Sequence, residues 1–104
     1  MSREEYYIGT ELKYAIALSC PGFSQATDDY TITLRCNNKE VVIPKEEVID
    51  GGNNDYYIVI DTSVFRKGQL KMIVTAEVED EDLPDGHRTE IAVKNLCWLK
   101  NPKA

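Results

Sequence analysis

The sequence predicts an all-β protein, an immunoglobulin-like antiparallel β-sandwich of about seven strands. Apolar and polar residues alternate over Gln69–Glu79 and again over Arg88–Leu99. Because successive side chains of a strand point to opposite faces, each segment should bury one face and expose the other. The loop Glu79–His87 between them contains the turn signal Pro84-Asp85-Gly86, which predicts a long antiparallel hairpin. Shorter strands with regularly spaced turn signals favour a sandwich, with a small closed barrel as the alternative.

The same alternation assigns the side chains of this hairpin to faces. In its first strand the expected buried residues are Leu70, Met72, Val74, Ala76 and Val78. In its second strand the pattern places one set on a single face: Thr89, Ile91, Val93, Asn95, Cys97 and Leu99. Leu96 and Trp98 are then expected on the opposite face.

Four predicted strands precede the middle of the chain. Their expected limits are Tyr6–Ile8, Glu11–Ser19, Tyr30–Cys36 and Glu40–Ile43. Pro21-Gly22 ends the second of them, because proline lacks a ladder donor and glycine tolerates turn dihedrals. Asn37-Asn38 suits a two-residue hairpin turn, and Pro44 closes the fourth strand.

The next part of the chain contains one further strand between two irregular segments. Lys45–Ile49 is open between a helical turn and an edge segment, and Asp50–Asn54 is expected as an exposed tip. Asp55–Ile60 is the fifth strand. Asp61–Gly68 predicts a crossover with a short helical turn, capped by Asp61 or Thr62 and ended by Gly68. Residues 1–104 form a single domain, with frayed ends expected at 1–4 and 101–104.

Composition and charge exclude several classes of protein. The chain has 104 residues, of which 42% are hydrophobic and 29% charged, as in globular proteins rather than disordered ones. Its net charge is −6, and its lysines and arginines form no tract, so we expect no nucleic-acid partner. No run of about 18 apolar residues is present, so we expect no membrane partner.

The cysteines indicate the compartment of synthesis. Cys20, Cys36 and Cys97 are odd in number and lack a CxxC spacing. The amino terminus is charged and lacks the apolar stretch of a signal peptide. We therefore expect synthesis in a reducing cytoplasm, with free thiols. The alternative is a Cys20–Cys36 disulfide, because both residues fall near the ends of neighbouring predicted strands.

The residues that could carry chemistry are few. His87, the single histidine, lies beside a turn glycine, whereas hydrolytic triads and most zinc sites need a placed imidazole with partners. Five loop carboxylates could offer oxygen ligands to calcium, but their spacing fails the EF-hand pattern: Glu79, Asp80, Glu81, Asp82 and Asp85. A charged hairpin tip that prevents edge pairing is the favoured interpretation. We expect no enzyme activity, cofactor, metal or small-molecule substrate.

The aromatic residues favour an interface. Tyr6-Tyr7 and Tyr56-Tyr57 are adjacent pairs, so one member of each pair faces away from the core. Exposed tyrosine and tryptophan are enriched at protein interfaces. The predicted contact residues are Trp98, Leu96, Tyr6, Tyr7, Tyr56 and Tyr57. A carbohydrate platform built from Tyr56, Tyr57 or Trp98 is the alternative.

Several segments in succession resemble a family of small immunoglobulin-like proteins encoded with the structural genes of tailed phages and prophages of gut Bacteroidales, including crAss-like phages. The resemblance runs over roughly residues 6 to 97 and lies in segments 9–14, 22–24 with 28–30, 60–63 with 68–70, and 82–90. These segments include Gly9-Thr10-Glu11-Leu12, Ile60-Asp61-Thr62-Ser63 and Leu83-Pro84-Asp85-Gly86-His87.

The resemblance implies a virion component, made in the host cytoplasm. It would be a head-fibre, capsid-decoration or attachment subunit that contacts other virion proteins and copies of itself. Because the chain ends a few residues after the last predicted strand, the resemblance favours a small adaptor or head-fibre subunit. The family offers no catalytic residues to this sequence.

Overall fold

The computed structural model describes residues 4–25, 27–53 and 55–102. Within these ranges the chain forms eight strands and two short 3₁₀ helices. They are β1 (Glu5–Tyr7), β2 (Glu11–Ala15), β3 (Tyr30–Cys36), β4 (Lys39–Pro44), η1 (Lys45–Glu47), β5 (Ile49–Gly52), β6 (Asp55–Asp61), η2 (Thr62–Val64), β7 (Gly68–Glu79) and β8 (His87–Lys100).

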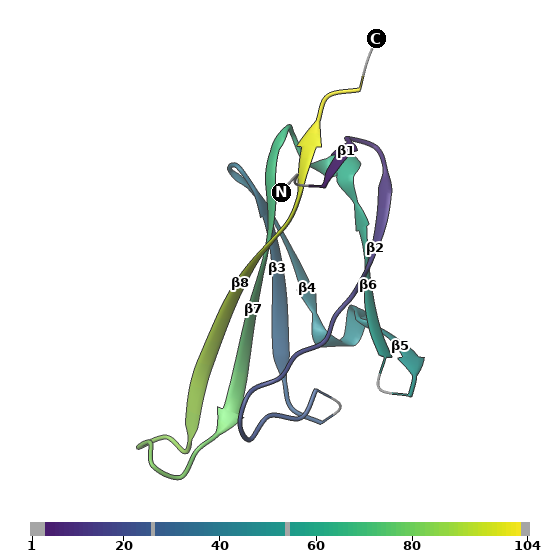
Figure 1. Ribbon diagram of the computed structural model, residues 1–104. Coiled ribbons are helices and arrows are strands. Elements are labelled where there is room, and N and C mark those ends of the chain that lie inside the picture. The colour runs from purple at the N-terminus through teal and green to yellow at the C-terminus, as the bar shows by residue number, and fades with distance from the viewer. Residues whose placement is uncertain (1–3, 26, 54, 103–104) are drawn as a thin grey trace.

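The strands form two sheets that face each other as a β-sandwich (Figure 1). The larger sheet has the order β1-β8-β7-β3-β4, and the smaller has the order β2-β6-β5. The β7–β8 hairpin diverges from the smaller sheet toward its turn, and the chain between β2 and β3 runs between them (Figure 1). Among the described residues no strand belongs to both sheets, so the barrel alternative is wrong.

The core lies between the inner faces of the two sheets. Every second residue of β3 and β7 points into it, as the period-two pattern predicts. The predicted inward set of β7 is buried, from Leu70 to Val78. Ile58 and Ile60 of β6 and Leu12 of β2 enclose the core from the smaller sheet.

The prediction of an all-β sandwich is confirmed, with two differences in the strands. The larger sheet is mixed, because β1 runs parallel to β8 and pairs Glu5 with Trp98 and Tyr7 with Lys100. Residues 50–52, predicted as part of an exposed tip, form β5 together with Ile49 beside β6, with a bulge between Asp50 and Gly52. The immunoglobulin-like topology stays a prediction.

The predicted strand limits are close to the observed ones except in β2. That strand ends at Ala15 rather than Ser19, although Ile16 after it remains buried. Asn37 has the positive φ expected in the turn between β3 and β4, whereas Asn38 does not. Of the ends predicted as frayed, 1–3 and 103–104 lie outside the described residues. The carbonyl of Glu4 accepts a hydrogen bond from the Trp98 N–H at 2.8 Å, so residue 4 is held to β8.

The crossover between the sheets is anchored by polar contacts. Asp61 caps η2 as predicted, because its carboxylate accepts a hydrogen bond from the Ser63 N–H at 3.0 Å. The helix ends at Val64, not at Gly68, which begins β7. The buried Thr62 hydroxyl donates to the Thr10 carbonyl at 2.6 Å and accepts from the Gly9 N–H at 2.9 Å. This pair of bonds ties η2 to the β1–β2 turn.

All three cysteines are free thiols, so the Cys20–Cys36 disulfide alternative is wrong. Cys36 and Cys97 are buried, whereas Cys20 is half-buried. The Cys36 thiol donates to the carbonyl of Arg66 at 3.2 Å. Burial raises the pKa of both the Cys36 and the Cys97 thiol, so both are held in the neutral form.

Candidate interaction surface

A β-bulge in β8 decides which of its side chains face outward. Leu70 of β7 lies opposite Cys97, but the next residue, Lys71, lies opposite Asn95, so Leu96 is an extra residue without a partner in the ladder. The bulge reverses the alternation. Cys97 and Leu99 are buried, whereas Ile91 and Val93 are 64% and 62% exposed. The prediction that these residues share one face is therefore wrong.

The exposed side chains of β8 belong to aliphatic rows that cross the outer face of the larger sheet. Residues directly opposite each other in a ladder share a face. The ladders align one row across four strands: Val42, Thr33, Ile73 and Val93. A second row beside it contains Pro44, Thr31, Thr75 and Ile91. We call these eight residues the outer patch.

The outer patch is open to solvent among the described residues. Val42 is 57% exposed, and the smaller sheet covers the opposite face. Seven of the eight residues are valine, isoleucine or threonine with branched Cβ atoms standing on a pleated sheet, and they form a largely apolar surface. Such a surface, exposed on a monomer, is typical of a site of interaction.

Polar rows border the outer patch on both sides. On one side the row is Glu40, Arg35, Lys71 and Asn95, in which Arg35 forms an ion pair with Glu40. On the other side the Thr89 hydroxyl donates to the Glu77 carboxylate at 3.0 Å. An apolar centre with a polar rim is the usual anatomy of a protein–protein interface.

The predicted contact residues of β1 and β8 lie beyond the first polar row. Trp98 lies opposite Gln69 and is half-buried on the outer face, while Tyr7 is 40% exposed with Lys100 Nζ 4.7 Å from its ring centroid. Tyr6 and Leu96 are partly buried and pack against the core. The expectation that one tyrosine of the pair faces outward thus holds for Tyr7.

Tyr56 and Tyr57 lie on β6, in the other sheet, and so do not join Trp98 in one surface. Tyr57 is half-buried on the outer face of the smaller sheet, where Lys13 Nζ lies 4.7 Å from its ring centroid. Tyr56 points between the sheets, into a cleft of about 380 Å³ lined also by Gln25, Tyr30, Lys45, Glu46, Val48 and Asp50. The six predicted contact residues therefore occupy four separate places.

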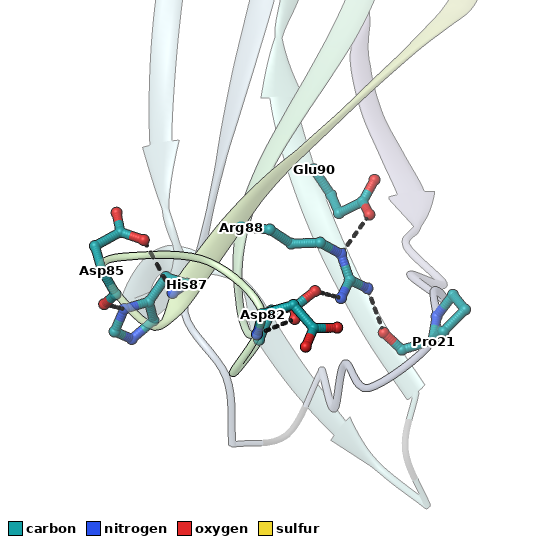
Figure 2. Close-up of polar contacts among 7 residues, drawn as sticks. Pro21, Asp82, Asp85, His87, Arg88 and Glu90 are labelled. Atoms are coloured by element: carbon teal, nitrogen blue, oxygen red, sulfur yellow. Dashed lines mark hydrogen bonds and ion pairs between the residues drawn. The ribbon is translucent and has the colours of Figure 1, made fainter.

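The acidic loop after β7 is organised by Arg88 (Figure 2). The Arg88 guanidinium donates to Glu90 at 2.8 Å, to Asp80 at 3.0 Å and to the carbonyl of Pro21 at 2.6 Å. The hydrogen bond from the Asp82 N–H and the one from Arg88 lower the pKa of Asp80. The contact with Pro21 ties the hairpin to the chain that follows β2.

Side chains of the loop are engaged in local contacts. Within the described residues, no three histidine, cysteine or acidic side chains gather as metal ligands would. Asp85 is engaged locally, because its carboxylate accepts from the His87 N–H at 3.2 Å and its carbonyl lies 3.1 Å from the His87 ring nitrogen Nδ1. His87 is exposed at the loop surface and is not enclosed in a cleft.

Sequence reasoning missed the outer patch because it used the wrong face of β8. A signal for the patch was nevertheless present in the sequence, because β3, β4 and β7 carry branched residues on the outer face as well as the inner one. Those on the outer face are Thr31, Thr33, Val42, Ile73 and Thr75. Branched residues on the expected wet face of several strands indicate a surface that is apolar on both sides of the sheet.

Comparison with known proteins identifies no relative, since no family model, no curated protein and no solved structure matches the chain. In the described residues no helix has the length and apolar character needed to cross a membrane.

Proposed function

We propose that this protein is a non-enzymatic structural subunit of a phage virion, a head-fibre, capsid-decoration or attachment protein that acts through protein–protein contacts. The observation that carries the proposal is the outer patch, a largely apolar and exposed surface on the larger sheet. The resemblance of the sequence to small phage structural proteins supports the virion as its setting. We propose another virion protein, with a flat apolar face of its own, as the occupant of the patch.

The physical basis is the free energy of burying aliphatic surface. Each Å² of apolar surface removed from water stabilises a complex by roughly 25 cal/mol. Val42, Ile91 and Val93 are each more than half exposed, so a flat partner could remove most of their surface from water. They stand on β4 and β8, two strands of one hydrogen-bonded sheet, so little side-chain or backbone entropy is lost on docking.

The experiment is incorporation of variants into particles of a phage that encodes the chain. Val42→Lys places a charge in the outer patch, and Val59→Lys is the matched control, because Val59 is 49% exposed on the smaller sheet. Mass spectrometry of gradient-purified particles should detect the wild-type chain and the Val59→Lys variant, and should find at least about tenfold less of Val42→Lys. Absence of the wild-type chain from particles would overturn the proposal.

A second candidate function is glycan binding in the cleft at Tyr56. The observation that favours it is an aromatic ring in a concavity with amide, ammonium and carboxylate groups around it, the arrangement that sugar hydroxyls require. Calorimetry with oligosaccharides from the host surface should then detect binding that Tyr56→Ala abolishes and Tyr57→Ala retains. Lack of binding by the wild-type chain would remove this candidate.

A further inference from the structure

We infer that the exposed edge of β8 pairs with the same edge of a second copy, in antiparallel orientation about a two-fold axis at Ala92. The inference rests on the proposed assembly function and names one partner, a second copy of this chain. The five-stranded sheets of the two copies would then join into one continuous sheet of ten strands.

The edge is open over most of the strand. β7 pairs with β8 along its whole length, whereas β1 pairs with it only from Trp98 to Lys100. Among the described residues, segment 87–97 therefore has no strand on its other side (Figure 1). Such an edge presents unpaired N–H and C=O groups that can extend the sheet. The middle residue of this open segment is Ala92.

Charge complementarity selects the register of pairing. A two-fold axis perpendicular to the sheet at Ala92 places Glu90 of each copy opposite Lys94 of the other. Both pairs lie on the inner face, because Glu90 lies opposite Ala76 and Lys94 opposite Met72 of β7. On the outer face the same axis places Ile91 opposite Val93 of the other copy.

Neighbouring registers lack this match. An axis at Ile91 would place Arg88 opposite Lys94 of the other copy, two like charges, and an axis at Val93 would place Glu90 opposite Leu96. Inward-pointing charges commonly protect an edge from pairing. Here Glu90, which also accepts from Arg88 of its own copy, and Lys94 have opposite sign and stand symmetrically about the centre of the open edge, so they attract rather than repel a second copy.

The other open edges are less suited to pairing. β2 has five residues, β4 has six and ends in Pro44, and β5 has four, two of them glycine, with a bulge. Short strands, proline and bulges are the features that keep edges from pairing. β8 offers the longest open edge among the described strands, and its bulge at Leu96 lies near one end of the open segment.

The pairing also enlarges the outer patch. Ile91 and Val93 are at the border of the patch in one copy and become its centre in the pair, next to their symmetry mates. The two patches then form one continuous aliphatic surface on a single face of the joined sheet. A partner virion protein would dock against a surface twice as large.

Disulfide cross-linking tests the register. In a Cys20→Ser background, Ala92→Cys places two thiols opposite each other across the axis, within the roughly 7 Å between Cα atoms that a disulfide spans. Lys94→Cys is the control, because its two copies would lie about 13 Å apart along the strands. Mild oxidation should yield a covalent dimer of Ala92→Cys and at least tenfold less of Lys94→Cys. Equal yields would overturn the inference.

Charge variants test the same pairing in solution. Lys94→Glu and Glu90→Lys each oppose like charges in their own dimers, so each should dimerise about tenfold more weakly than the wild-type chain. A mixture of the two variants brings opposite charges together and should restore a dimer in sedimentation velocity. A wild-type chain that is monomeric at every concentration, or a mixture no more dimeric than its components, would overturn the inference. Incorporation of that monomer into particles would leave the proposed function standing.

Discussion

Leu70 of β7 lies directly opposite Cys97 of β8, and the side chains of both are almost completely buried. One step along the ladder, Lys71 lies opposite Asn95, so Leu96 is passed over. Because of this single extra residue, the odd-numbered side chains of β8 face solvent before Leu96 and the core after it. The bulge gives the strand two functions, since its carboxyl-terminal end closes the core and its amino-terminal end presents Ile91 and Val93 to solvent.

The reversal predicts that two substitutions by alanine in β8 lower the free energy of unfolding by different amounts. Leu99→Ala should lower the free energy of unfolding by about 2–5 kcal/mol, because it opens a cavity in the core. Val93→Ala should change it by no more than about 0.5 kcal/mol, because Val93 is 62% exposed. Urea denaturation at low protein concentration measures both. Equal losses would place both side chains in the core and contradict the bulge.

The contacts of Asp80 predict an acid-dependent contribution to stability. The pKa of Asp80 is lowered in the folded chain by hydrogen bonds from the Asp82 N–H and from Arg88. Its charged form therefore stabilises the fold above the ordinary aspartate pKa of about 4, and this contribution is lost as the pH falls below that value. The melting temperature of Asp80→Asn should be lower than that of the wild-type chain at pH 7, and the gap should close by about pH 2.

Asp82→Asn is the matched control in the same loop, because the Asp82 carboxylate accepts no hydrogen bond in the described part of the chain. Its melting curve should follow that of the wild-type chain at both pH values. A gap for Asp80→Asn that is independent of pH would assign its effect to packing rather than to charge.

The hydroxyl of Tyr14 predicts a nearly neutral substitution. It is buried, and among the described residues its nearest polar neighbour is the Cys97 thiol, a weak partner whose geometry does not meet that of a hydrogen bond. Tyr14→Phe removes an unpaired polar atom, so the free energy of unfolding should stay the same or rise by up to about 1 kcal/mol. A loss of more than about 1 kcal/mol in urea denaturation would instead indicate a hydrogen bond to this oxygen.

The same residue predicts alkaline sensitivity. Burial, followed by the neighbouring Cys97 thiol, raises the pKa of Tyr14. A raised pKa in the folded state contributes stability that is present below about pH 10, the ordinary tyrosine pKa, and is lost as the pH rises further. Tyr14→Phe should therefore retain more of its stability than the wild-type chain between about pH 10 and 11, as measured by thermal denaturation.

The thiols predict stepwise labelling. Burial raises the pKa of Cys36 and of Cys97, and alkylation requires an accessible thiolate. Iodoacetamide at pH 8 should modify the half-buried Cys20 first, and the two buried thiols only after denaturant is added. Mass spectrometry of the intact chain counts the adducts. Three adducts at equal rates in the folded state would contradict the burial of Cys36 and Cys97.

Much of the fold follows from local signals. The limits of β3, the β7–β8 hairpin and the cap at Asp61 agree with prediction, because alternation, turn residues and capping side chains act between near neighbours in the chain. The burial of alternate residues in β7, from Leu70 to Val78, has the same origin. A regular strand that packs on one face needs no information beyond its own sequence pattern.

The candidate site was less predictable. The sequence grouped six residues on the basis of chemistry, and the structure separates Trp98 from Tyr56 and Tyr57 because they belong to different sheets. It also turns Tyr6 toward the core through the parallel pairing of β1 with β8, in which Tyr6 lies opposite the buried Leu99. Pairing between distant strands is not encoded in spacing along the chain.

By itself the sequence determined an all-β protein with a long hairpin and an acidic turn. Tertiary structure alone decided that Ile91 and Val93 face solvent, that rows from four strands align into the outer patch, and that the first part of β8 is an open edge. The physical reason is that an extra residue at a bulge, and the coverage of a face or an edge, depend on which distant segment lies alongside. Local alternation divides the side chains between two faces but does not show which face is covered.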